Sequence, residues 1–270
     1  MKFIDFFAGI GGFRIGMEMA GHECVGHCEI DKYADMSYRM MHTVTEEQRQ
    51  ELMGMSLKDR QKEIGKEKYL NGEWYADDIR RVEPGDLPKS DCYCFGFPCQ
   101  SFSIAGHRRG FEDTRGTLFF EVMRLAKERH PEYLFAENVS GLLNHDGGGT
   151  FETIIRTMDE LGYSVEWQVL NSKYYVPQNR ERVFIIGHLG ELSGREIFPI
   201  TAYSEPFNEL QGQQDRIIAN TIAAGDRVQV GVYPIESGGG AQSKRLSQGL
   251  IYETDTDNDG DNSDRQYSRE

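Results

Sequence analysis

Short apolar runs alternate with amphipathic segments along about the first two thirds of the chain. The apolar runs have the length of β-strands and cover residues 2–6, 23–28, 91–95, 132–136, 164–170 and 182–187. Segments with apolar residues at helical spacing fall at residues 11–20, 31–41, 117–129 and 151–161, with Asp31 as a candidate N-cap. This alternation predicts an α/β fold with a doubly wound, mostly parallel sheet. Only a loop separates the last two predicted strands, so we expect them to pair antiparallel at one edge of the sheet.

Three regions depart from this pattern and suggest the domain organisation. Residues 44–72 are highly charged, which predicts an exposed helical insertion outside the core of a catalytic domain spanning residues 1–190. Residues 191–250 form an extension, in which residues 227–233 predict one strand. Residues 251–270 hold seven acidic residues, two basic ones and almost no apolar ones, so we expect a disordered tail.

Composition narrows the class of protein. Hydrophobic residues make up 38% of the 270-residue chain, enough for a folded core, and no apolar run has the ~18 residues of a membrane-spanning helix. No secretory signal is recognisable at the start, and the odd number of cysteines, five, favours a reducing cytoplasmic location. The net charge of −14 counts against a nucleic-acid partner in general, although local basic patches decide phosphate contact.

A zinc site is the alternative for Cys24 and Cys28 together with His22 and His27. Side chains alternate between the two faces of the strand predicted here, and no second ligand pair follows at zinc-finger spacing. We therefore expect no metal.

A glycine-rich turn joins the first predicted strand to the first predicted helix. Glycines let the backbone approach a ligand closely, and the N–H groups that begin a helix are free to bind it. Glu29 closes the second strand, where a carboxylate can accept both hydroxyls of a ribose. Asp78 can accept from an adenine amino group while Ile79 packs on the ring. Because ligands bind at the carboxyl ends of parallel strands, these residues predict a nucleotide-like cofactor there.

Four further residues carry candidate chemistry. Cys99 follows Pro98, and a cysteine suits a reaction in which a soft nucleophile adds to a ring and then leaves. The alternative is a buried cysteine that only packs. Glu137 follows a predicted strand, where burial of a carboxylate requires a partner or a function. Arg180 and Arg182 lead into the last strand and can contact an oxygen or a phosphate through two donors, the alternative being a solvated turn.

These motifs, in this order and spacing, resemble those of the DNA cytosine-5 methyltransferases over about residues 2–187. The matching segments are residues 7–12, Glu29, Asp78-Ile79, Pro98-Cys99-Gln100, residues 115–121, Glu137-Asn138-Val139 and Gln178-x-Arg180-x-Arg182. The resemblance implies the Rossmann-like fold of the S-adenosylmethionine-dependent methyltransferases. It also implies transfer of a methyl group from S-adenosyl-L-methionine to C5 of cytosine in double-stranded DNA, through a covalent bond between Cys99 and C6.

The resemblance further implies roles for single residues. Glu137 contacts N3 and the exocyclic amine of the cytosine and Arg182 its O2 side, and the expected catalytic residues are Cys99, Glu137, Arg182, Arg180 and Gln178. The expected cofactor-binding residues are Phe7, Ala8, Gly9, Ile10, Gly11, Gly12, Glu29, Ile30, Asp78, Ile79, Pro98 and Leu118. The expected DNA-binding residues, within or beside a mobile loop over residues 101–114, are Gln100, Ser101, Ser103, His107, Arg108 and Arg109. A tRNA-modifying relative shares this fold, so RNA remains an alternative substrate.

Residues 188–270 depart from the family pattern, because they show neither a clear target-recognition region nor a terminal Gly-Asn motif. One interpretation is a split methyltransferase of a restriction-modification system, in which a second subunit carries the recognition region. The other is a non-catalytic remnant that binds the cofactor or DNA.

Overall fold

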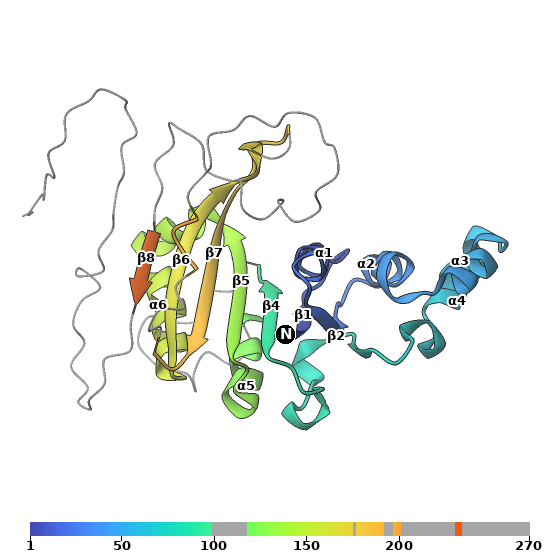
Figure 1. The fold of residues 1–270 in the computed structure, drawn as a ribbon, viewed down its shortest axis with the longest axis horizontal. Coiled ribbons are helices and arrows are strands. Elements are labelled where there is room, and N and C mark those ends of the chain that lie inside the picture. The colour runs from blue at the N-terminus through green and yellow to red at the C-terminus, as the bar shows by residue number, and fades with distance from the viewer. Residues whose placement is uncertain (99–117, 175–176, 192–196, 201–229, 234–270) are drawn as a thin grey trace, which may run out of the picture.

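A single mixed β-sheet forms the centre of the protein (Figure 1). The computed structural model describes residues 1–98, 118–174, 177–191, 197–200 and 230–233. Within these residues the sheet has eight strands in the order β3-β2-β1-β4-β5-β7-β6-β8. The strands are β1 Lys2–Phe6, β2 Glu23–Cys28, β3 Trp74–Ala76, β4 Cys92–Gly96, β5 Tyr133–Val139, β6 Tyr163–Asn171, β7 Glu181–Leu189 and β8 Val230–Tyr233.

Helices cover both faces of the parallel part of the sheet. They are α1 Gly12–Met19, α2 Lys32–Tyr38, α3 Glu46–Met53, α4 Leu57–Ile64, α5 Leu118–Arg129 and α6 Gly149–Glu160. A π-helical turn, η1 Arg39–Thr43, continues α2, and the short 3₁₀ segments are η2 Glu67–Leu70, η3 Ile79–Arg81, η4 Pro84–Asp86, η7 Ser140–Gly148 and η8 Ser172–Tyr174. The predicted doubly wound α/β fold is therefore confirmed.

The alternation of side chains along β4 shows how the two faces are covered. Tyr93 and Phe95 point into the main core, which α5 and α6 complete. Cys92 and Cys94 point to the other face, where Met17 of α1 packs on them. All four described cysteines are buried free thiols. Because β4 is buried on both sides, it reads as a continuous apolar run in the sequence, as central parallel strands do.

The antiparallel strands lie together at one end of the sheet, as expected. β7 is antiparallel to β5 and to β6, and β8 is antiparallel to β6. The last predicted strand does not form the edge of the sheet, because β7 lies between β5 and β6. Residues 230–233 of the strand predicted over 227–233 form β8, and residues 227–229 lie outside the described part.

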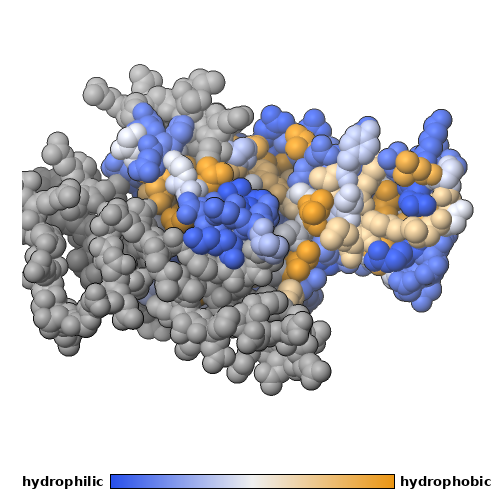
Figure 2. Space-filling model, turned by 90° about the horizontal axis from the view of Figure 1, so that it is seen from above, coloured by the Kyte–Doolittle hydropathy of each residue, from blue (hydrophilic) through white to orange (hydrophobic). Residues whose placement is uncertain are grey.

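The predicted insertion is helical but has a small core of its own. Leu52 of α3 and Tyr69 of η2 are fully buried and pack with Ile64 and Val44 in a cluster separate from the main core. The expectation of an exposed segment missed this cluster, because its four apolar residues are spread among many charged ones. Figure 2 nevertheless shows apolar surface on the side of the molecule that carries α2 to α4.

One strand boundary and one additional strand differ from the sequence-based expectations. The strand predicted over residues 132–136 continues to Val139, so Glu137 lies inside β5 and not after it. The three-residue strand β3 was not predicted, since a run this short carries no periodic signal. The predicted N-cap Asp31 is confirmed, because its Oδ1 accepts the Tyr33 and Ala34 amides at 2.8 and 2.9 Å. No helix in the described part of the chain is long and apolar enough to cross a membrane.

Candidate active site

The glycine-rich turn leaves β1 in a left-handed conformation. Phe7, Gly9 and Gly11 have φ angles of 55°, 56° and 92°, a region that favours glycine. The Ala8 amide donates to the Cys28 carbonyl at 3.1 Å, so the turn lies against the end of β2. The turn therefore sits at the carboxyl ends of β1 and β2, where α1 begins.

Glu29 is fixed by the backbone on both sides of it. Its Oε2 accepts the Gly9 amide and its Oε1 the Asp31 amide, each at 2.7 Å. Each carboxylate oxygen has two lone pairs, so each can accept one further hydrogen bond from a ligand hydroxyl. Ile30 follows Glu29 in the sequence and Ile10 follows Gly9, whose amide binds this carboxylate; the two isoleucines are 66% and 57% exposed, unusual values for isoleucine. A buried, preoriented acceptor flanked by exposed apolar side chains fits a ligand with a hydroxyl-bearing ring.

Asp78 lies at the end of the third strand, before η3. Its carboxylate accepts from the Arg80 guanidinium at 2.7 and 2.8 Å and from the Arg80 amide at 3.1 Å, and the guanidinium lowers the pKa of the Asp78 carboxyl. Ile79 is only 2% exposed and packs in the main core. Arg124 of α5 donates to the Ile79 and Val82 carbonyls at 3.3 and 2.8 Å, which holds η3 against α5.

A second group of side chains gathers on β5 and β7. Glu137 is paired across the sheet with Gly96 of β4 and Phe184 of β7. Its Oε1 lies 2.8 Å from Nε of Arg182 and 3.6 Å from a guanidinium nitrogen of Arg180. The structure thus brings together three of the five predicted catalytic residues. Gln178 is exposed in the β6–β7 connection, where its carbonyl accepts from Ser172.

Asn138 follows Glu137 in the sequence motif, and the sequence alone indicates no role for it. Its side chain is 3% exposed, and its Nδ2 donates to the Phe97 carbonyl at 2.8 Å. This hydrogen bond joins β5 to Phe97. The next residue, Pro98, is exposed. Asn138 thereby fixes the backbone that leads to Cys99.

Asp5 is a buried carboxyl that sequence analysis missed. It is fully buried in β1, and neither oxygen has a hydrogen-bond partner within the described residues. Burial raises the pKa of the Asp5 carboxyl, and the opposing influence of the Arg14 amide and guanidinium is smaller. The only sign of the buried carboxyl in the sequence is that Asp5 is an acidic residue among the apolar residues of a strand.

The remaining predicted positions divide into two sets. Leu118 begins α5 and is half-buried against the main core. Those outside the described residues are Cys99, Gln100, Ser101, Ser103, His107, Arg108 and Arg109. Within the described residues no group of three histidine, cysteine or acidic side chains could hold a metal ion.

Phe13 of α1 connects the two groups of side chains. Its ring packs edge-on against Phe135 of β5 with 5.0 Å between the ring centroids. A Cβ placed on Gly96 would lie 3.9 Å from Phe13 and 3.4 Å from Oε2 of Glu137. Glu137 therefore lies at the carboxyl end of β4 on the face covered by α1, the helix that follows the glycine-rich turn.

One family model and several known proteins are similar to this chain in sequence. The model of the family described as "C-5 cytosine-specific DNA methylase" matches residues 1–64 and 66–223. The chain is 40% identical over 194 residues to the type II methyltransferase M.HhaI of Haemophilus parahaemolyticus, covering 72% of this chain and 50% of that protein. It is 37% identical over 229 residues to the type II methyltransferase M.HaeII of Haemophilus aegyptius, covering 84% and 62%. The chain thus spans about half the length of the curated relatives it matches.

Two solved structures share the fold. A putative DNA modification methyltransferase encoded within an Escherichia coli prophage aligns with a TM-score of 0.51 and 19% identity, covering 88% of this chain and 62% of that one. The Dnmt2 methyltransferase of S. pombe aligns with a TM-score of 0.50 and 19% identity, covering 70% and 51%. At this identity the likeness supports the fold alone.

Proposed function

Because the chain belongs to the C-5 cytosine-specific DNA methylase family, we propose that it transfers a methyl group from S-adenosyl-L-methionine to C5 of cytosine in DNA. The observation that carries the proposal is the pairing of Glu137 with Arg182 beside the end of β4, which leads to Pro98 and Cys99. The relatives named as type II methyltransferases support the same reaction.

The residues at the ends of β1 and β2 fit the cofactor. Glu29 offers two oriented oxygens for the ribose hydroxyls. Nothing lies within 4 Å of the point where a Cβ of Gly9 would stand, which leaves space next to this carboxylate. Asp78 would accept from the adenine amino group, in competition with Arg80. S-Adenosyl-L-methionine supplies an activated methyl group, and these side chains would bind and orient it.

Cys99 would act as the nucleophile. Its sulfur forms a bond to C6 of the cytosine, and the electron pair of the C5–C6 double bond moves to C5. C5 would then bond to the methyl group as the bond between that group and the sulfonium sulfur breaks, and the electron pair of the broken bond would stay on the sulfur. Loss of the C5 proton returns the electron pair to the ring, and the Cys99 thiolate leaves.

Glu137 and Arg182 would stabilise the charge that this addition creates. A carboxyl group at N3 and the exocyclic amine can hold or donate a proton, and a guanidinium near O2 stabilises negative charge. In the structure the two side chains neutralise each other at 2.8 Å, so the base would replace part of this ion pair. Arg180 lies farther from the carboxylate and would support it by charge alone.

DNA binding would rest mainly on residues 100–114, with His107, Arg108 and Arg109 near phosphates. The target base must leave the helix, at a cost of a few kcal/mol that contacts around the vacated position offset. In this family a recognition region supplies such contacts. We therefore expect this chain alone to bind DNA weakly and without strict sequence preference, and a second subunit that reads the sequence stays a prediction.

Methyl transfer with the purified chain tests the proposal. The chain is incubated with methyl-labelled S-adenosyl-L-methionine and either a mixed-sequence DNA duplex or tRNA, and the nucleosides are then analysed. We expect 5-methylcytosine in DNA, at low yield and in many sequence contexts, and none in RNA. Cofactor binding without transfer to DNA would favour the non-catalytic alternative. Methylation confined to one DNA motif would show that the chain itself reads the sequence.

A further inference from the structure

His42 connects the π-helical turn η1 to the glycine-rich turn after β1. Its Nε2 lies 2.9 Å from the carbonyl oxygen of Ile10, 32 residues away in the sequence. A carbonyl can only accept, so Nε2 carries the proton and donates it. Ile10 follows directly on Gly9, whose amide binds Glu29. The histidine therefore holds the turn at the residue that follows the one bound by Glu29.

The same ring also fills the space beside Gly11. A Cβ on Gly11 would lie 2.8 Å from Cδ2 of His42 and 3.1 Å from Cε2 of Tyr38. Gly11 has a φ angle of 92°, so the position requires glycine for its backbone and for its surroundings. The turn is thus enclosed by β2 on one side and by the His42 and Tyr38 rings on the other.

A buried ion pair fixes the backbone of His42. Arg14 of α1 is 5% exposed and binds both carboxylate oxygens of Glu73 at 2.7 and 2.8 Å. The same guanidinium lies 3.4 Å from the His42 carbonyl and 5.4 Å from the centre of the Tyr38 ring. Tyr38 in turn meets the His42 ring edge-on, with 4.9 Å between centroids. These contacts restrict the imidazole to one orientation.

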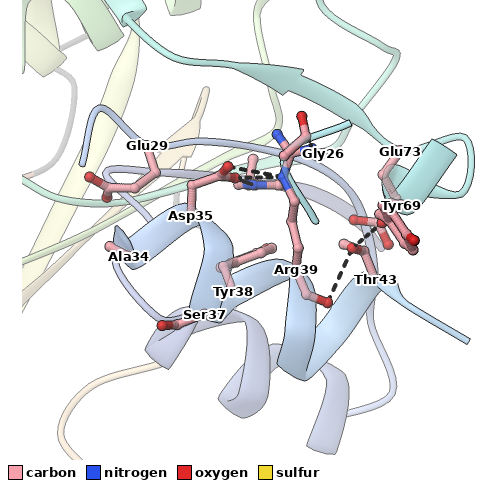
Figure 3. Close-up of polar contacts among 12 residues, drawn as sticks. Gly26, Glu29, Ala34, Asp35, Ser37, Tyr38, Arg39, Thr43, Tyr69 and Glu73 are labelled. Atoms are coloured by element: carbon pink, nitrogen blue, oxygen red, sulfur yellow. Dashed lines mark hydrogen bonds and ion pairs between the residues drawn. The ribbon is translucent and has the colours of Figure 1, made fainter. Parts of the chain in front are cut away.

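The helical insertion supports η1 from its other side. Figure 3 shows the Thr43 hydroxyl joined to the carbonyls of Arg39 and Tyr69, at 3.3 and 2.5 Å. Asn71, which follows η2, donates to the Thr43 carbonyl at 2.5 Å. The extra residue of a π-helical turn shifts the register of the side chains that follow it, and such turns are frequent at functional sites.

We infer that His42 is a positioning residue for the cofactor, which holds Ile10 and Gly11 in the conformation that presents the turn to S-adenosyl-L-methionine. The inference rests on the proposed function. Without the imidazole, the turn keeps the bond from Gly9 to Glu29 but loses the hydrogen bond at Ile10 and the ring that packs beside Gly11. Cofactor affinity then falls, because part of the binding energy is used to order the turn.

Three variants separate the hydrogen bond from the ring. His42→Ala removes both, His42→Phe keeps a ring without a donor, and His42→Gln keeps an N–H donor at a similar reach. Calorimetry should show about fivefold weaker binding of S-adenosyl-L-methionine to the Ala and Phe variants, the loss expected for one neutral hydrogen bond, and recovery to within about twofold in the Gln variant. The KM for the cofactor should rise while kcat at saturating cofactor stays unchanged.

Hydrogen exchange tests the positioning without any cofactor. Amides of residues 8–13 should exchange faster in His42→Ala than in the wild type, while amides of β5 keep their protection. His22→Ala is the matched control, because His22 lies at the amino end of β2, beside the chain's terminal amine. It should change neither measurement.

The outcomes are distinct. Unchanged exchange in residues 8–13, or unchanged cofactor affinity in His42→Ala, would overturn the inference. Equal loss of affinity in the Gln and Ala variants would overturn the role of the donor. A wild-type chain that binds no S-adenosyl-L-methionine would overturn the proposed function instead, and the exchange data would still decide whether His42 orders the turn.

Discussion

Glu29 and Glu137 both lie at the carboxyl edge of the sheet, yet they are held in different ways. Backbone amides of Gly9 and Asp31 bind Glu29, so its position follows from the course of the main chain. Glu137 is held by the guanidinium groups of Arg182, in β7, and of Arg180, which directly precedes β7. The first arrangement suits a carboxylate that binds the same ligand in every cycle. The second suits one whose partners change when a base enters.

The largest effect is expected at Glu137. Glu137→Gln keeps the shape of the side chain but removes its charge and its ability to transfer a proton. We expect kcat to fall by about 10²–10⁴-fold, the usual contribution of general acid–base catalysis, with cofactor affinity unchanged. Single-turnover methyl transfer measures the first quantity and calorimetry the second. Glu160→Gln, at the exposed end of α6, is the control. A loss of cofactor affinity as large as the loss in kcat would remove the distinction between the two carboxylates.

Glu29 should show the reverse pattern. Glu29→Ala removes the acceptor for the ribose and leaves the Gly9 and Asp31 amides without their partner. We expect about 10- to 150-fold weaker binding of S-adenosyl-L-methionine, the range for hydrogen bonds to a charged group. At saturating cofactor kcat should recover. Unchanged affinity in a titration would place the cofactor elsewhere.

The packing of β3 against β2, the strand that leads to Glu29, can be tested at Gly26. A Cβ on Gly26 would lie 2.6 Å from the Trp74 carbonyl oxygen, so Gly26→Ala must displace β3. We expect a loss of about 1–3 kcal/mol in the free energy of unfolding, as for other overpacked sites. Gly16→Ala in α1 is the matched control, since its Cβ would meet nothing within 4 Å, and it should be neutral or stabilising. Urea unfolding measures the free energy of unfolding of both variants. Equal values would mean that β3 can move away from β2 at no cost in stability.

The smallest effect is expected at Asp31, which caps α2 and contributes an amide to Glu29. Hydrogen bonds from the Ala34 and Tyr33 amides lower the pKa of the Asp31 carboxyl. Because the pKa of Asp31 is lower in the folded than in the unfolded protein, its ionised carboxylate stabilises the fold. This stabilisation is complete above the unfolded-state pKa of about 3.9 and is lost as the pH falls through the folded-state pKa. Asp31→Ala should therefore lower Tm slightly at pH 7 and by less at pH 2–3. Asp31→Asn keeps a capping oxygen and should lower Tm less than Asp31→Ala at pH 7. A Tm difference between Asp31→Ala and the wild type that is the same at both pH values would contradict the cap.

Local signals predicted the strand end and the helix start on either side of Glu29. Glu29 and Asp31 are recognisable because a strand end, an acid and a helix start fall within a few residues. The sheet class followed in the same way from the alternation of apolar runs. These features depend on neighbours in the sequence, so their pattern is visible without the fold.

Features that depend on distant contacts could not be predicted. His42 lies in the π-helical turn η1, and its Nε2 bonds to the Ile10 carbonyl, 32 residues away in the sequence. Asn138 reaches across strands to Phe97, and β7 enters the sheet between β5 and β6. Tyr69 reads as one aromatic residue among charges, although it is fully buried. In each case the role of the residue depends on a contact partner that is distant in the sequence, so only the fold reveals it.

Covalent trapping tests the central claim most directly. A DNA duplex with 5-fluorocytosine in place of cytosine is incubated with the chain and S-adenosyl-L-methionine, then denatured and separated by mass. Fluorine cannot leave C5 as a proton does, so the bond between Cys99 and C6 should persist, and the wild type should form a complex that survives denaturation. Cys99→Ala should form none. A trapped complex with Cys99→Ala, or a wild type that methylates ordinary DNA but is never trapped, would contradict the account.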